Sequence, residues 1–133
     1  TYIRAQPFAR KDASVIVGHS AGGLGALALT AEGPAGIAGI VVFAPGRGGH
    51  KDGRAGAICA PEKLIATAGE LGEGARMPVT WLVAENDSYF PPEFSRRMAD
   101  AFRKAGGTVE FRALPPFGNE GHWLAEAAAA ARR

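Results

Sequence analysis

The sequence predicts an α/β fold whose strands form a parallel sheet connected by right-handed crossovers. Two observations support this class. Four short apolar runs alternate along the chain with stretches of good helix formers, and Gly or Pro separates most of these segments. The chain has 133 residues, enough for one ordinary domain, and shows no internal repeat and no linker typical of a domain boundary. We therefore treat residues 1–133 as belonging to a single domain.

The first half of the chain contains two expected strands with a helix between them. Residues 1–9 resemble the end of a helix that breaks at Pro7. The run at 14–17 is apolar on both faces, which favours a buried parallel strand, and 21–30 contains the small and aliphatic residues of a helix. A second buried strand is expected at 37–43.

The second half repeats this alternation after an irregular stretch. Residues 46–76 depart from the strand–helix rhythm, and we interpret them as a surface excursion that could contribute to a substrate pocket. The elements expected from there on are a helix at 61–71, a strand at 79–84, a helix from 92 to 105, a strand at 108–113 and a closing Ala-rich helix at 123–132.

The most specific motif is Gly18-His19-Ser20-Ala21-Gly22, which fits the pattern G-x-S-x-G between an expected strand and an expected helix. A serine on such a sharp turn is held in strained backbone angles, and its neighbours two residues away must lack bulk. The turn projects the Ser20 hydroxyl out of the sheet and aims the Ala21 N–H at developing negative charge. The alternative interpretation is a Gly-rich structural turn with a surface serine.

A serine nucleophile needs a base, and the chain contains three histidines. His19 is next to Ser20 in the turn, so we expect it to point elsewhere and to serve in packing or in support of the site residues. His50 lies in the Gly-rich excursion, where a solvated position is favoured and a role in a pocket stays open. His122 follows the last expected strand, and loops at the carboxyl ends of parallel strands gather on the edge of the sheet where Ser20 lies. His122 is therefore the predicted base.

The base in turn needs an acid that fixes its tautomer. Residues 84–88 lie at the carboxyl end of the third expected strand, on the same edge of the sheet. Asp87 is the better candidate because it lies beyond the strand, where the turn can aim it inward, and Glu85 is the alternative. The structural interpretation of Asp87 is a cap for the helix that begins near Pro92.

These residues give the sequence a resemblance to the C-terminal half of an α/β-hydrolase, most similar to the dienelactone-hydrolase-like serine esterases. The stretches that carry the resemblance are 15–29 (VIVGHSAGGLGALAL), 79–92 (VTWLVAENDSYFPP) and 117–122 (FGNEGH). The order Ser20, Asp87, His122 is also the order nucleophile, acid, base in that fold. The resemblance implies those three roles, with Ala21 as one oxyanion donor.

The sequence departs from the resemblance in two ways. Dienelactone hydrolases proper use a cysteine at the position of Ser20, so an ester or related acyl substrate is favoured over their lactone. The family fold has about eight strands, of which this chain supplies only the elbow strand and the three after it, and the second oxyanion donor comes from a loop before them. The apolar strand at 14–17 would then have an uncovered edge. We therefore expect the N-terminal half of the same protein as a partner, in the same chain or as a separate one.

The activity implied is cleavage of a carboxylic ester or related acyl bond in a small molecule through an acyl-serine, with no metal or organic cofactor. Four aromatic residues beside the acid and the base are candidates for lining an apolar acyl pocket, with plain core positions as the alternative. They are Tyr89, Phe90, Phe117 and Trp123. The same triad would serve a peptidase, an amidase or an acyltransferase. An alternative of another class is a non-catalytic binding domain or an inactive fragment of a hydrolase.

Composition argues against several other classes. The 15 basic residues are scattered without interleaved aromatic residues and nearly balance 13 acidic ones, which argues against a nucleic-acid groove. No apolar run approaches the roughly 20 residues of a membrane span. The single cysteine, Cys59, allows no internal disulfide and lies in the excursion, where it is not a plausible nucleophile. Gly23-x-Gly25-x-x-Ala28 superficially fits a dinucleotide fingerprint, but it falls inside an expected helix and no acidic residue ends the next strand.

Overall fold

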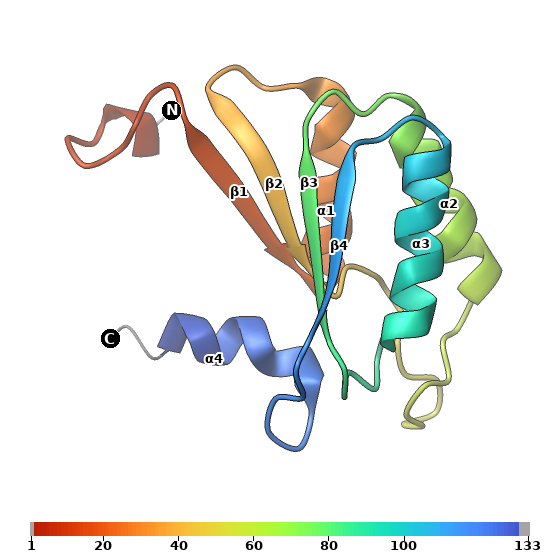
Figure 1. Cartoon of the computed structure of the whole chain (residues 1–133). Coiled ribbons are helices and arrows are strands. Elements are labelled where there is room, and N and C mark those ends of the chain that lie inside the picture. The colour runs from red at the N-terminus through yellow and green to blue at the C-terminus, as the bar shows by residue number, and fades with distance from the viewer. Residues whose placement is uncertain (1, 131–133) are drawn as a thin grey trace.

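The computed structural model describes residues 2–130 as one parallel sheet with helices between its strands (Figure 1). The sheet has four strands in the order β1-β2-β3-β4, so each strand pairs with the next one along the chain. The strands are β1 (Ser14–His19), β2 (Ile37–Phe43), β3 (Val79–Ala84) and β4 (Val109–Leu114). The helical elements are η1 (Ile3–Ala5), α1 (Ser20–Glu32), α2 (Pro61–Glu73), α3 (Pro92–Lys104), η2 (Gly121–Trp123) and α4 (Leu124–Ala130).

The predicted parallel-sheet α/β class is confirmed, and the differences lie at element ends. β2 and β3 have the expected bounds, whereas β1 continues two residues further because its pairing with β2 extends to His19 opposite Phe43. The N-terminal segment is not the end of an α-helix: a single 3-10 turn precedes Pro7. The closing helix begins only at Leu124, after η2, and its expected last residues, 131 and 132, lie outside the described residues.

The hydrophobic core lies between one face of the sheet and the first three α-helices. α1 packs on β1 and β2, α3 packs on β3 and β4, and α2 packs on both α1 and α3. In β3 the alternate residues Val79, Trp81 and Val83 are 2% exposed or less, because side chains one residue apart point to opposite faces of a strand. From α3, Met98 and Phe102 are fully buried against this face.

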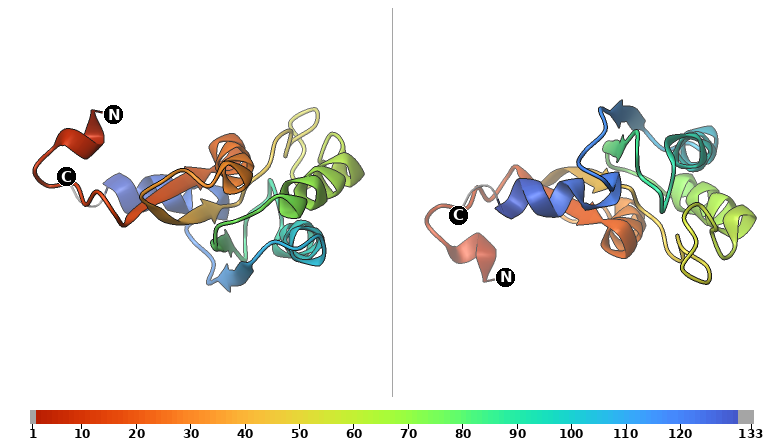
Figure 2. Two further views of the ribbon diagram at one scale, coloured as in Figure 1. Left: turned by 90° about the horizontal axis from the view of Figure 1, so that it is seen from above. Right: turned by 90° about the horizontal axis from the view of Figure 1, so that it is seen from below.

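The β1 edge of the sheet is open in the part of the chain that the structure describes. β1 pairs with β2 alone, and its residues Val15 and Val17, which alternate with the helix-facing positions, are 53% and 63% exposed. The N-terminal segment with η1 projects beyond this edge, as both views of Figure 2 show. The excursion after β2 reaches α2 through an irregular loop, and among residues 2–130 no helix is long and apolar enough to cross a membrane.

The parallel arrangement brings three chain segments to one edge of the sheet. Ser20 follows β1 directly, Asp87 lies three residues after β3, and His122 lies eight residues after β4 in η2. Because all four strands run in the same direction, their carboxyl ends lie at the same edge. This edge holds the candidate site.

Candidate active site

Ser20 occupies a strained turn between β1 and α1. Its φ is +53°, in the left-handed region that residues other than Gly rarely adopt. A Cβ added to Gly18 would lie 2.6 Å from the Gly22 carbonyl oxygen and 2.8 Å from the Gly23 Cα, so the close approach of strand and helix requires glycine at this position. At Gly22 the expected requirement is absent, because an added Cβ would meet no atom within 4 Å.

The three predicted site residues lie in one hydrogen-bonded line. His122 Nδ1 lies 3.0 Å from Asp87 Oδ2, and His122 Nε2 lies 3.1 Å from Ser20 Oγ. His122 is 2% exposed and Asp87 3%, while Ser20 is half-buried. The fold therefore brings together side chains that are 102 residues apart at the extremes.

The turn after β3 aims the Asp87 carboxylate at His122. Asp87 Oδ1 accepts hydrogen bonds from the backbone N–H groups of Tyr89 and Phe90, at 2.8 and 2.9 Å, which leaves Oδ2 for the imidazole. This is the local side-chain-to-backbone bonding that aspartate favours in turns. Glu85, the alternative acid, is exposed. Its backbone N–H donates to the Leu114 carbonyl at the end of β4.

The hydrogen bonds among Asp87, His122 and Ser20 indicate which atoms carry the protons. An ionised carboxylate only accepts, so His122 Nδ1 donates its proton to Asp87. In the neutral imidazole Nε2 then carries a lone pair and accepts from the Ser20 hydroxyl. The arrangement can withdraw a proton from Ser20 and hold the resulting imidazolium beside a buried negative charge.

His19 lies beside His122, in the supporting position that was one of the two roles expected for it. Since β1 continues to His19, the imidazole is directed toward the loop that carries His122. His19 Nε2 donates to the His122 carbonyl oxygen at 2.7 Å, and the two rings are 4.7 Å apart. Its Nδ1 lies 3.7 Å from Glu126 Oε1 in α4. His19 therefore packs against His122, the predicted base.

Two side chains that sequence reasoning missed join the loop after β3 to the loop after β4. Asn86 Oδ1 accepts from the Phe117 N–H at 2.8 Å, and its Nδ2 donates to the carbonyls of Phe117 and Gly118, both at 3.1 Å. Glu120 Oε1 accepts from the backbone N–H groups of Ser88 at 3.1 Å and His122 at 2.9 Å.

The Glu120 carboxylate also accepts from the Ser88 hydroxyl through Oε2. Burial alone would raise the pKa of Glu120, but the Ser88 hydroxyl, the backbone N–H groups of His122 and Ser88, and the positive charge of His122 when it is protonated together hold it below its usual value. Glu120 is the N-cap residue of η2, a position where sequence favours Ser, Thr, Asp or Asn, so the sequence carried no signal for it.

The four aromatic candidates have different surroundings. Phe90 is a core residue, 1% exposed, which agrees with the core interpretation rather than the pocket one. Tyr89 stacks on His122 at a centroid distance of 4.2 Å, and on His50 at 3.7 Å. Trp123 is 42% exposed and meets the His122 ring edge-on at 5.2 Å. Phe117 is half-buried beside Asn86.

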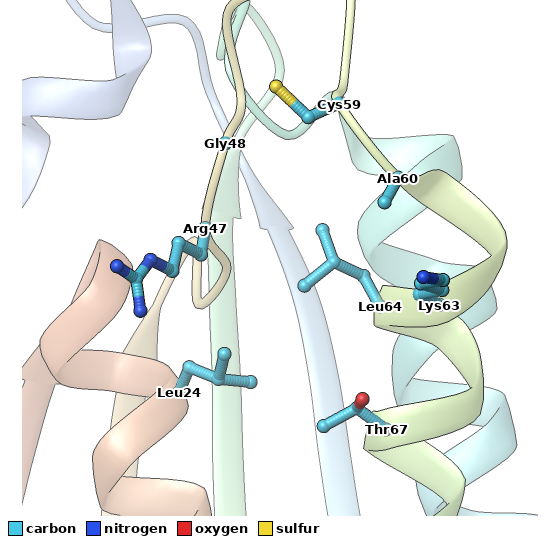
Figure 3. Close-up of a pocket in the computed structure, with 8 residues that line it drawn as sticks. All are labelled: Leu24, Arg47, Gly48, Cys59, Ala60, Lys63, Leu64 and Thr67. Carbon is cyan, nitrogen blue, oxygen red and sulfur yellow. The ribbon is translucent and has the colours of Figure 1, made fainter.

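A separate groove of about 420 Å³ lies between α1 and α2 (Figure 3). Leu24 from α1 and Leu64 and Thr67 from α2 point toward one another across it. Its complete lining is Leu24, Arg47, Gly48, Cys59, Ala60, Lys63, Leu64 and Thr67. The groove contains none of the three line residues, and Cys59 is exposed with a free thiol. Within residues 2–130 no three His, Cys, Asp or Glu side chains are grouped so that they could hold a metal ion.

Solved structures place this architecture among known folds. No family model and no curated protein matches the sequence. A candidate dienelactone hydrolase from Klebsiella pneumoniae is similar at TM-score 0.54 and 17% identity, over 85% of this chain and 42% of that one. The naproxen esterase of Bacillus subtilis matches at TM-score 0.57 and 15% identity, over 91% of this chain and 58% of that one. A candidate non-haem bromoperoxidase from Mycobacterium tuberculosis matches at TM-score 0.54 and 15% identity, over 90% and 65%.

The architecture is that of the α/β-hydrolase fold. The chain spans about two fifths to two thirds of the length of these three structures, between 42% and 65%. The chain thus has a partial α/β-hydrolase fold with four parallel strands, as the sequence predicted.

Proposed function

We propose that this chain carries the catalytic triad of a serine hydrolase that cleaves a carboxylic ester. The observation that supports the proposal is the line from Asp87 through His122 to Ser20, with distances of 3.0 and 3.1 Å, on a serine held at positive φ. A purely structural turn needs neither the buried acid nor a histidine that joins it to the serine.

The proposed reaction follows from the positions of the protons on Ser20 and His122. Ser20 Oγ attacks the carbonyl carbon of the ester while His122 Nε2 takes the hydroxyl proton. The tetrahedral intermediate collapses as the C–O bond to the alcohol breaks and His122 returns the proton to the leaving oxygen. Water then attacks the acyl-serine with its proton passing to His122, and Ser20 is restored as the acid departs. Asp87 stabilises the imidazolium in both steps.

The oxyanion is stabilised by the N–H of Ala21 at the start of α1, where backbone donors are unpaired. In this proposal the second donor and further strands beside β1 come from the N-terminal part of the same protein. Two observations support that partner: within residues 2–130 β1 pairs with β2 alone, and Val15 and Val17 expose apolar side chains on the sheet face opposite α1. The chain alone is therefore expected to be less active than the whole protein.

The substrate proposed is a small ester with an apolar acyl group. Tyr89 and Trp123 lie next to His122 and are partly exposed, so they can contact such a group. The name of one matched structure, a naproxen esterase, supports ester cleavage on this fold. A peptidase, an amidase or an acyltransferase would use the same three residues and differs only in leaving group or acceptor.

A fluorophosphonate probe tests the proposal, because it phosphonylates only activated serines. In the natural full-length protein we expect labelling of Ser20, none in Ser20→Ala, and a labelling rate lower by about 10² to 10⁴-fold in His122→Ala. Ser14→Ala is the matched control, since the Ser14 hydroxyl donates to the Arg10 carbonyl, at the other end of β1 from Ser20, and its loss should not affect labelling. Absence of labelling in the full-length protein would favour a non-catalytic binding domain and contradict the proposal.

A further inference from the structure

We propose that Glu120 is a positioning residue that holds the catalytic base by its backbone and ties it to the loop of the acid. The inference rests on the proposed function, since it concerns the placement of His122 relative to Ser20. Nothing in the G-x-S-x-G motif or in the triad requires a glutamate at this position.

Three donors converge on the Glu120 carboxylate. The N–H groups of Ser88 and His122 donate to Oε1, and the Ser88 hydroxyl donates to Oε2. Because Ser88 has one hydroxyl proton and a carboxylate only accepts, that proton is directed at Glu120. His50 Nε2, 3.1 Å from Ser88 Oγ, must then donate to the hydroxyl oxygen. His50 therefore donates to Ser88, and Ser88 donates to Glu120.

The backbone of His122 needs such a restraint. His122 lies in a turn of three residues that begins with Gly121, and the loop before it contains Gly118 at a φ of +51°. Glycine backbones have wide conformational freedom, so the turn itself does little to hold the base. Glu120 binds the N–H of His122 at 2.9 Å, and His19 binds its carbonyl oxygen at 2.7 Å. The residue is thus held at both peptide groups.

The restraint acts on the distance that matters for catalysis. His122 Nε2 and Ser20 Oγ are 3.1 Å apart, near the upper limit for effective proton transfer. A shift of the His122 backbone would move Nε2 away from the serine, and a misplacement of about 1 Å costs on the order of 10²-fold in rate. The hydrogen bonds that lower the pKa of Glu120 keep it a carboxylate, and hence a strong acceptor, at neutral pH.

Glu120→Ala and Glu120→Gln in the natural full-length protein separate positioning from a general loss of structure. Alanine removes all three bonds, whereas the glutamine amide oxygen can still accept from both backbone N–H groups. In Glu120→Ala we expect the limiting rate of fluorophosphonate labelling to fall about 10- to 100-fold with unchanged probe affinity. Glu120→Gln should recover most of the rate. Glu70→Ala and Glu70→Gln, at an exposed position of α2, are the matched controls and should label normally.

Hydrogen exchange of the His122 amide gives a second readout that needs no activity. We expect faster exchange in Glu120→Ala and near-normal exchange in Glu120→Gln, since only alanine leaves that N–H without its acceptor. The loop is still joined to the acid loop by Asn86, so Glu120→Ala should remain folded. If it does not fold, Ser88→Ala, which removes the hydroxyl from the carboxylate, replaces it and should give a smaller change of the same sign.

The two readouts also separate this inference from the hydrolase proposal. A wild-type protein that does not label contradicts the hydrolase proposal, while the amide exchange still decides whether Glu120 holds His122. Wild-type rates of both labelling and His122 exchange in Glu120→Ala would overturn the role of Glu120. The same conclusion would follow if alanine and glutamine lowered the rate equally, because a lost charge rather than lost backbone bonds would then be responsible.

Discussion

Two strands of the sheet, β1 and β3, have similar sequences and different surroundings. Both are short apolar runs that lead directly to a site residue, Ser20 after β1 and Asp87 after β3. β3 lies between two strands and is buried except for the half-buried Thr80 and Leu82, whereas β1 is an edge strand with Val17 63% exposed. An apolar run therefore predicts a strand suited to burial, while the actual burial of the strand depends on the elements that lie beside it.

The two faces of β1 also differ in burial. On its helix-facing side Gly18 is buried in close contact with α1, and on the opposite side Val15 and Val17 are exposed. The geometry of Ser20 therefore depends on one side of the strand only. This separation explains how the elbow can be formed in a chain that covers only part of the α/β-hydrolase structures it resembles.

The largest effect is expected in the middle of β3. Trp81 is fully buried, and Trp81→Ala should lower the free energy of unfolding by about 3 to 5 kcal/mol, because it removes a large contact surface and leaves a cavity. Urea denaturation followed by circular dichroism measures this. A loss below about 1 kcal/mol would mean that β3 is not the centre of the core.

The next effect concerns the contact of β1 with α1. Gly18→Ala would place a methyl group against backbone atoms that cannot move aside, so we expect a loss of about 3 kcal/mol together with weaker labelling of Ser20. Gly25→Ala is the control within α1: its added Cβ meets no atom within 4 Å, and the variant should gain up to about 1 kcal/mol. Equal behaviour of the two variants would contradict the tight elbow.

The same substitution in the two strands compares them most directly. Val83→Ala in β3 should cost about 2 kcal/mol, because two buried methyl groups are worth about 0.8 kcal/mol each and a cavity adds to this. Val17→Ala in β1 should change the free energy of unfolding by less than about 0.5 kcal/mol. A large cost at Val17 in the full-length protein, with the isolated chain unaffected, would indicate that other parts of the protein cover this strand.

The smallest effect is expected from the protonation of Glu120, which lies in the loop after β4 and bonds Ser88 in the loop after β3. Its pKa in the folded chain is lowered from an ordinary value of 4.5, so it stabilises the fold fully above that value and progressively less as the pH falls through the lowered pKa. Between about pH 6 and pH 3, stability measurements should therefore show the wild type losing its advantage over Glu120→Gln. Glu70→Gln serves as the control for loss of one charge. An advantage that grew on acidification would contradict the lowered pKa.

Much of the site could be predicted because its residues are recognisable from local sequence. A serine between two glycines at a strand–helix junction, an aspartate just after a strand and a histidine in a late loop are defined by spacing and by the shared edge of a parallel sheet. Asn86 and Glu120 could not be found in this way. Their partners lie in a second loop about 30 residues away in sequence, and only folding brings them within bonding distance.

The strand–helix alternation, the strained turn at Ser20 and the chain order of the three site residues could all be predicted from sequence alone. These features depend on backbone sterics and side-chain periodicity, which act over a few residues. Three further features appear only in the folded chain: β1 is an edge strand among residues 2–130, His19 contacts His122, and Glu120 binds the His122 backbone. Such contacts depend on distances between segments far apart in the chain, and no local pattern encodes which of the available polar partners a side chain will meet.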